Sequence, residues 1–234
     1  MLVIGVAGLG GFLMFRALQG APGNGAIKPI TGVPQPNPQS HPEVIADPGA
    51  PVAKRPIPDS LPEIMLADAS GKPTKLASFG GRPLMVNFWA TWCAPCRREI
   101  PLLNKIREER KSQNAEIVGV AVDFREDVVK FLQKTPLSYP LLIGEEDGLA
   151  AAEAFGMGMA FPFSVFVDSR NRILTIKIGE LHEDEANFAF DRLRDIDNGV
   201  LSREAAQAAV SDAFREMAAE RAREEAASGS KIAK

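Results

Sequence analysis

The sequence predicts an α/β domain between about residues 58 and 198, in which helices cover a central mixed sheet. Apolar, strand-like runs alternate with helix-like segments throughout this region. One of the runs, residues 115–122, is apolar almost without interruption, as expected of a strand inside a sheet covered on both faces. The last two runs are joined by the polar segment Asp168-Ser169-Arg170-Asn171, which indicates an antiparallel hairpin.

The elements follow one another in a regular order. The first strand is expected at Leu84-Met85-Val86-Asn87-Phe88-Trp89, which is rich in residues of high strand propensity. Further strands are expected at residues 115–122, 140–143, 163–167 and 173–178, and helices at residues 97–112, 126–134, 149–155 and 183–196. The chain's cysteines therefore lie at the junction between the first strand and the first helix.

The first 57 residues have a different composition. Residues 1–20 begin with a mostly apolar stretch that ends at Arg16, and ten of the 18 prolines lie between residues 21 and 58. We expect residues 21–57 to form a Pro-rich, semi-extended linker, which cannot bury enough apolar area to offset its ordering entropy. The expected domains are thus 1–20, 21–57, 58–198 and 199–234.

Three interpretations of residues 1–20 compete: a signal-peptide core, a short membrane anchor and a core helix, the last being the weakest because the linker separates it from any core. Arg16 and Lys28 lie on the side that would have to cross the membrane, which conflicts with export. An upstream start codon that supplies basic residues would remove the conflict, and sequencing the 5′ region tests this.

The C-terminal segment, residues 199–234, is rich in Ala, Glu and Arg and follows the helix-stop signal Asn198-Gly199. We expect a helix over residues 203–227 with a thin apolar stripe. A solvated helix that lies partly on the domain is favoured over a helix for a partner or a second copy, since an Ala-rich stripe buries little area.

Composition narrows the classes of function. The chain has 234 residues, 45% of them hydrophobic and 24% charged, which is ordinary for a globular protein. Its formal net charge of −3 gives no support to a nucleic-acid partner. The two cysteines stand together as Cys93-Ala94-Pro95-Cys96, too close to staple distant segments.

The Cys-x-x-Cys motif predicts redox chemistry. A cysteine at a helix N-terminus meets free backbone N–H groups and the positive end of the helix dipole, which favour the thiolate, so Cys93 is the predicted nucleophile. Cys96, one turn later, is placed to resolve a mixed disulfide, and Pro95 suits a first helical turn. A closed zinc site is disfavoured, because His41 and His182 are the only histidines.

The residues from Val86 to Pro101, with Trp92-Cys93-Ala94-Pro95-Cys96 at their centre, resemble the signature of membrane-anchored thioredoxin-like proteins of the TlpA, ResA and CcmG type, most of all TlpA. Leu61-Pro62-Glu63 and residues 68–73 resemble that family's entry hairpin. The resemblance covers about residues 58–197. It implies a thioredoxin fold with an N-terminal β-hairpin and a central βα insertion, and needs no organic cofactor or metal.

The resemblance also implies a bacterial thiol-disulfide oxidoreductase that faces the periplasm and is anchored to the inner membrane. Such proteins usually act as reductants in cytochrome c maturation or cytochrome oxidase assembly. Their substrates are protein disulfides or CxxC motifs, and their donor is a membrane electron carrier of the CcdA or DsbD type. A reduction potential near that of thioredoxin, about −270 mV, is expected.

Further site residues follow from the same resemblance. Glu99 matches a partly buried glutamate that assists proton transfer, and Asn87 stands where thioredoxin has an aspartate. Phe161-Pro162 resembles the cis-proline loop that pairs with the substrate chain. With Trp92, Ala94 and Pro95, these two residues make up the expected substrate contacts.

Three alternatives stay open at this point. A copper-handling module of the Sco type would use Cys93, Cys96 and His182, although Sco proteins space their cysteines as CxxxC. A peroxidase of the peroxiredoxin class would need a P-x-x-x-[ST]-x-x-C motif, which the sequence lacks. A scaffolding role would depend on the C-terminal segment.

Overall fold

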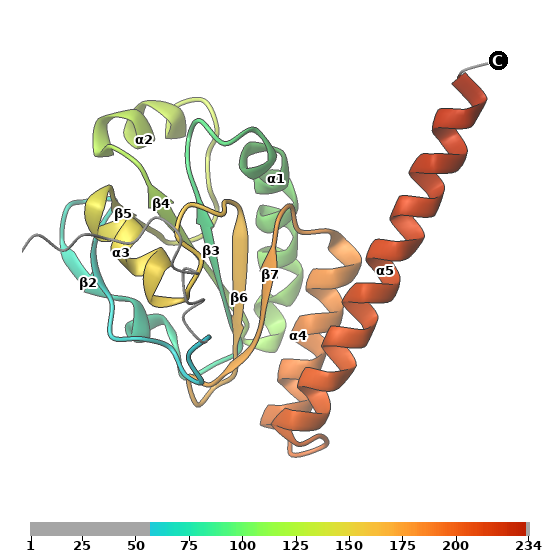
Figure 1. Ribbon diagram of the computed structural model, residues 1–234. Helices are drawn as coiled ribbons and strands as arrows, with labels where there is room; N and C mark the ends of the chain where they lie inside the picture. The colour runs from blue at the N-terminus through green and yellow to red at the C-terminus, as the bar shows by residue number, and fades with distance from the viewer. Residues whose placement is uncertain (1–56, 233–234) are drawn as a thin grey trace, which may run out of the picture. The chain divides into compact units, whose positions relative to one another are not determined.

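The computed structural model describes residues 57–232, with side chains through residue 228 (Figure 1). The expectations for residues 1–20 and for nearly all of the linker therefore lie outside the described residues. Among the helices of residues 57–232, none combines the length and the apolar character needed to cross a bilayer.

A seven-stranded mixed sheet forms the centre of the domain, in the order β2-β1-β5-β4-β3-β6-β7 (Figure 1). β3 is parallel to β4 and β4 to β5, whereas β6 and β7 are antiparallel to their neighbours, as are β1 and β2. The strands are β1 (Met65–Asp68), β2 (Pro73–Lys75), β3 (Leu84–Trp89), β4 (Glu116–Val122), β5 (Leu141–Gly144), β6 (Phe163–Val167) and β7 (Ile173–Ile178). The β1–β2 hairpin lies where the entry hairpin is expected.

The helices lie close to their predicted positions. They are α1 (Ala94–Arg110), α2 (Arg125–Leu132), α3 (Glu146–Ala154), α4 (Glu183–Asp197) and α5 (Arg203–Ile232), with short 3-10 turns at Leu76–Phe79 and Lys111–Gln113. In sequence, β5 and α3 stand between the β3–α1–β4 half and the β6–β7–α4 half, in the place of the expected βα insertion. α3 begins three residues before the predicted start, with Glu146 and Asp147 in its first turn, where the helix dipole favours acidic side chains.

α1 also begins earlier than the predicted residue 97, and this difference matters for the site. Cys93 is its N-cap, and the Cys93 sulfur accepts the backbone N–H of Cys96 at 3.3 Å. Pro95 occupies the first turn, where no N–H donor is needed. The Cys-x-x-Cys motif therefore forms the N-cap and first turn of α1, which confirms its expected place at a helix N-terminus.

Side-chain alternation along the strands assigns the two faces of the sheet. Met85 and Phe166 pack in one cluster with α1, α4 and the start of α5, whereas Val86 and Phe88 pack in another cluster with α3. Burying a large apolar side chain contributes about 1.5–3 kcal/mol, so β3, which has all six residues buried, is anchored from both sides. Its end, where α1 begins, is thereby held rigidly.

The C-terminal helix α5 packs on its own domain along its first half. Ala206 and Val210 are fully buried in the cluster that contains the α4 residues Phe190 and Leu193, and Phe214 packs against the same cluster. From Arg215 onward most residues are exposed, with Met217 and Arg221 partly covered. The apolar stripe noted in the sequence therefore packs against the chain's own domain along the first half of α5.

Candidate active site

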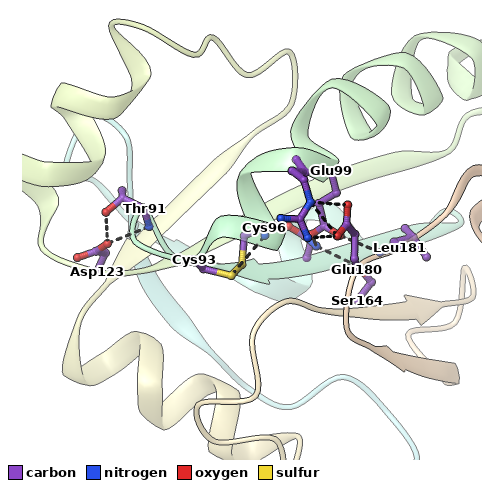
Figure 2. The surroundings of a disulfide bond; sticks show 10 residues. Thr91, Cys93, Cys96, Glu99, Asp123, Ser164, Glu180 and Leu181 are labelled. Atoms are coloured by element: carbon purple, nitrogen blue, oxygen red, sulfur yellow. Dashed lines mark hydrogen bonds and ion pairs between the residues drawn. A yellow bond between two sulfur atoms is a disulfide. The ribbon is translucent and has the colours of Figure 1, made fainter. Parts of the chain in front are cut away.

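The two cysteines form a disulfide where β3 meets α1 (Figure 2). Cys93 keeps 6% of its surface exposed, and Cys96 none. Of the two cysteines, Cys93 is therefore the one that solvent reaches. The backbone N–H of Cys96 and the N-terminal end of α1 both point positive charge at it, which stabilises a thiolate after reduction.

Glu99 is buried beside the disulfide, with 2% of its surface exposed, one turn beyond Cys96 on α1. Burial raises the pKa of its carboxyl to about 7, although hydrogen bonds from the Leu181 N–H and the Asn87 side chain act in the opposite direction. A carboxyl with this pKa exchanges protons readily near neutral pH.

Two elements donate hydrogen bonds to Glu99, and a third supports one of these donors. The Asn87 amide of β3 donates to Glu99 Oε1 at 2.7 Å, and to Ser164 Oγ of β6 at 3.1 Å. The N–H of Leu181, in the connection before α4, donates to Glu99 Oε2 at 3.0 Å. The Asn87 amide, which stands where thioredoxin has an aspartate, therefore orients the Glu99 carboxylate supplied by α1.

The sequence analysis missed Ser164 and Leu181. Ser164 is the only polar residue of the buried strand β6, and this is the one sequence feature that could have pointed to it. Leu181 acts through its backbone, and no side-chain motif reveals such a contact.

A second polar pair holds the other side of the disulfide, away from Glu99 (Figure 2). Asp123 Oδ2, just after β4, accepts the backbone N–H of Thr91 at 3.0 Å and the Thr91 hydroxyl at 2.5 Å. Its other oxygen accepts the N–H of Phe124 at 2.9 Å. These bonds fix the segment just before Cys93, and the sequence analysis missed them too.

The expected substrate contacts gather near the disulfide. Trp92 is 58% exposed, and its ring meets Phe161 edge-on, with ring centroids 6.1 Å apart. Both rings line a surface hollow together with Phe124 and Met159, two further exposed apolar side chains. Sequence reasoning missed Phe124, an apolar residue two positions after the end of β4.

The cis-proline loop is present as expected from the resemblance. The Phe161–Pro162 peptide bond is cis, and Pro162 is buried. The N–H of Phe161 donates to the Met159 carbonyl at 2.9 Å, so a substrate that pairs with this N–H must first open that bond. Phe161 also stacks on Phe163, with ring centroids 6.3 Å apart, which ties the loop to the core.

Ala94 and Pro95 lie between the cysteines on the first turn of α1. Ala94 is exposed and Pro95 partly so. Both small residues leave the surface beside Cys93 open to an approaching chain.

A metal centre is not supported. Within residues 57–232, no three His, Cys, Asp or Glu side chains are grouped so that they could hold a metal ion. His182 is the N-cap residue of α4. The copper-module alternative built on Cys93, Cys96 and His182 therefore has no support from the structure.

Comparison with known proteins decides the family. The model of the AhpC/TSA family matches residues 57–176, just over half of the chain. The chain belongs to the AhpC/TSA family. Two relatives are named thiol-disulfide oxidoreductase ResA: one from Geobacillus thermodenitrificans is 29% identical over 127 residues, covering 54% of this chain and 71% of the relative. The other, from Bacillus anthracis, is 30% identical over 120 residues, covering 51% and 68%.

Solved structures agree with this assignment. A Chlorobium tepidum protein assigned as the thiol:disulfide interchange protein DsbE superposes with a TM-score of 0.50 at 25% identity, covering 55% of this chain and 89% of that one. A secreted thiol-disulfide isomerase from Corynebacterium glutamicum shares the fold, with a TM-score of 0.53 at 24% identity, covering 58% and 85%. The predicted thioredoxin fold and the predicted enzyme class, a thiol-disulfide oxidoreductase, are both confirmed.

Proposed function

We propose that this AhpC/TSA-family protein reduces disulfide bonds of other proteins, with Cys93 as the nucleophile, Cys96 as the resolving cysteine and Glu99 as the proton-transfer group. The observation that carries the proposal is the buried Glu99 carboxyl, which lies one turn from Cys96 and has a pKa of about 7. A group of this kind is suited to take and return a proton at each turnover near neutral pH.

The proposed reaction begins with the reduced protein. The Cys93 thiolate attacks one sulfur of the substrate disulfide, so that a mixed disulfide forms while the substrate S–S bond breaks. The leaving substrate sulfur departs as a thiolate and takes up a proton. At this stage the mixed disulfide has replaced the substrate disulfide, and no electrons have passed to any group outside the protein and its substrate.

Resolution completes the reaction. Cys96 gives its thiol proton to Glu99, and its thiolate attacks the Cys93 sulfur. The Cys93–Cys96 disulfide forms, and the second substrate sulfur leaves as a thiolate that takes the proton back from Glu99. Two electrons have moved from the protein dithiol to the substrate, and the product is the oxidised state in which the structure is found.

The exposed aromatic surface supports binding of a polypeptide. The Trp92 ring meets Phe161, which packs against the cluster that contains Cys93, and Ala94 and Pro95 leave the approach open. Large, rigid aromatic side chains are common anchors at protein interfaces, because they bury much area for little lost entropy. We infer that an extended segment of the substrate lies across this surface.

The proposed setting is the periplasmic side of a bacterial inner membrane. Residues 1–20 would serve as anchor or signal and residues 21–57 as linker, with the catalytic domain at 58–198 and a helical segment at 199–234. The oxidised protein would be recharged by a membrane dithiol carrier of the CcdA or DsbD type. Its substrates would belong to cytochrome c maturation or cytochrome oxidase assembly. These assignments are supported by the resemblance to ResA-type proteins.

Insulin reduction with a dithiol donor tests the chemistry. We expect Cys93→Ser to abolish the activity and Cys96→Ala to accumulate a mixed disulfide through Cys93, which mass spectrometry of non-reduced samples detects. Glu108→Gln, on an exposed part of the same helix, should behave as the wild type. Full activity of Cys93→Ser would refute the assigned nucleophile.

Equilibration with glutathione tests the direction of transfer. A potential near that of thioredoxin, about −270 mV, fits a reductant, whereas a value near −120 mV would make the protein an oxidant. Substrates are identified with the Cys96→Ala variant, since the captured protein stays covalently attached.

A further inference from the structure

The connection between β7 and α4, residues 179–182, reaches into the active site. The N–H of Leu181 is one of two hydrogen-bond donors to the Glu99 carboxylate, at 3.0 Å from Oε2. Because this donor is a backbone group, its position depends on what holds the connection at its two ends.

A single buried carboxylate, Glu185 of α4, holds both ends. Its Oε1 accepts from the Lys177 ammonium of β7 at 2.8 Å, just before the connection. Its Oε2 accepts the backbone N–H of His182 at 3.1 Å, at the end of the connection. Glu185 is completely buried, so its position is fixed by these partners rather than by solvent.

The C-terminal helix supplies the remaining partner. Arg221 of α5 contacts Glu185 Oε1 with one arm of its guanidinium, and bonds Asp184 Oδ2 at 3.0 Å with the other arm. A fully buried carboxylate is costly unless it is paired with cations and donors. Arg221 and Lys177 together compensate Glu185, and Arg221 links this cluster to α5.

We propose that Arg221 is a positioning residue for Glu99: through Glu185 it holds the connection whose Leu181 amide bonds the Glu99 carboxylate. The inference rests on the proton-transfer role of Glu99 under the proposed function, and it gives α5 a part in that role. The match to the family model ends at residue 176, so α5 lies outside the part of the chain that carries the family resemblance.

Several charged groups face Glu99, and they set the direction of the expected effect. Glu180 raises the pKa of Glu99 and Lys177 lowers it. The Tyr139 hydroxyl also lies near, since burial and, to a smaller extent, the Glu99 charge raise the pKa of Tyr139. Arg98, from α1, is engaged with Glu180, with its Nη2 at 2.5 Å from Oε2. Asn87 contributes a neutral contact to Glu99, and Ser164 bonds Asn87 instead of Glu99 itself.

Removal of the Arg221 charge has two effects on the pKa of Glu99, and both have the same sign. A looser connection weakens the Leu181 hydrogen bond, which lowers the pKa of Glu99 while it is intact. The uncompensated charge of Glu185 also draws Lys177 more strongly, and Lys177 is the cation that lowers the same pKa. Both changes raise the pKa of Glu99.

The experiment measures that pKa directly, in the oxidised full-length chain. The carboxyl ¹³C resonance of Glu99, assigned by its loss in Glu99→Gln, is titrated in the wild type, Arg221→Met and Arg215→Met. Arg215 is the matched control, since it pairs with Asp212 on the exposed face of the same helix. We expect an upward shift of about half a unit to one unit in Arg221→Met, the size of one weakened hydrogen bond, and none in Arg215→Met.

Two further variants keep the test decisive. Arg221→Lys, which retains the charge, should shift the pKa less than Arg221→Met does. Arg221→Gln, which retains a donor, replaces the Met variant if circular dichroism shows that the latter does not fold. An unchanged Glu99 pKa in a folded Arg221 variant, or an equal shift in Arg215→Met, overturns the proposal.

The titration and the insulin assay can fail independently, so together they distinguish failure of this proposal from failure of the proposed function. The titration reads the Glu99 carboxyl without any turnover, whereas the insulin assay of Glu99→Gln reads the proton-transfer role. Unchanged activity of Glu99→Gln with a shifted pKa in Arg221→Met would reject the catalytic role and keep the positioning contact. If Glu99→Gln loses activity but the Glu99 pKa is unchanged in Arg221→Met, only the positioning role of Arg221 is rejected.

Discussion

Glu99→Gln offers a quantitative test of the buried carboxyl. In the folded protein, burial raises the pKa of Glu99 to about 7, from an ordinary value of 4.5. The difference, at about 1.4 kcal/mol per unit, corresponds to roughly 3 kcal/mol of folding free energy that depends on pH. Since Glu99 is almost fully buried, solvent screening takes little away from this figure.

The sign follows from which state binds the proton more tightly. Between pH 4.5 and 7 the folded state keeps the Glu99 proton, whereas the unfolded state has released it. The contribution of Glu99 to stability is therefore complete below pH 4.5 and is lost as the pH rises to about 7. The Gln side chain carries no such proton, so its contribution stays constant over the same range.

Urea unfolding of the oxidised protein, followed by tryptophan fluorescence from pH 4.5 to 8, measures the effect. The difference in unfolding free energy between variant and wild type should move by about 3 kcal/mol in favour of Glu99→Gln as the pH rises. Gln has one acceptor where the carboxylate has two, which adds a constant cost of about 1–3 kcal/mol. A difference that does not change with pH would refute the assigned pKa, and Glu108→Gln should give that flat profile.

Three other substitutions probe the surroundings of the disulfide. Asp123→Ala leaves the N–H and hydroxyl of Thr91 without their acceptor and should lower the unfolding free energy by about 2 kcal/mol in urea titrations. Phe163→Ala, in the core against Phe88, should cost about 3–5 kcal/mol in the same measurement. Trp92→Ala should leave stability within about 0.5 kcal/mol of wild type but raise KM for insulin, because its ring is exposed beside Cys93.

Each of these three predictions has either a control variant or a result that would contradict it. Ile178→Ala, at an exposed position, should cost less than about 0.5 kcal/mol, in contrast to the core substitution. An Asp123→Ala variant as stable as the wild type would show that the Thr91 contacts contribute nothing net. A loss of kcat for Trp92→Ala, with KM unchanged, would argue against a role in substrate binding.

The α/β fold and the location of the Cys-x-x-Cys chemistry could both be predicted from local patterns of residues. Hydrophobic periodicity is a local signal, and it located β3, β4, β6 and β7 and the helices to within a few residues. The Cys-x-x-Cys motif is equally local, since a single helical turn brings Cys93 and Cys96 together. The start of α1 was predicted three residues late, although the motif was expected at the helix N-terminus. That the Cys93 sulfur accepts the Cys96 N–H shows only once the backbone is folded.

The contacts that hold the site in place could not be predicted in this way. Glu99 bonds Asn87 from β3 and Leu181 from beyond β7, and Asp123 reaches Thr91 across 32 positions of sequence. Arg221 meets Glu185 across 36 positions. Such contacts depend on which elements become neighbours in the sheet and its helical layer, and no local pattern of residues encodes them. The burial that raises the pKa of Glu99 likewise comes from the surrounding elements together, so it belongs to the assembled fold and not to the glutamate's place in the sequence.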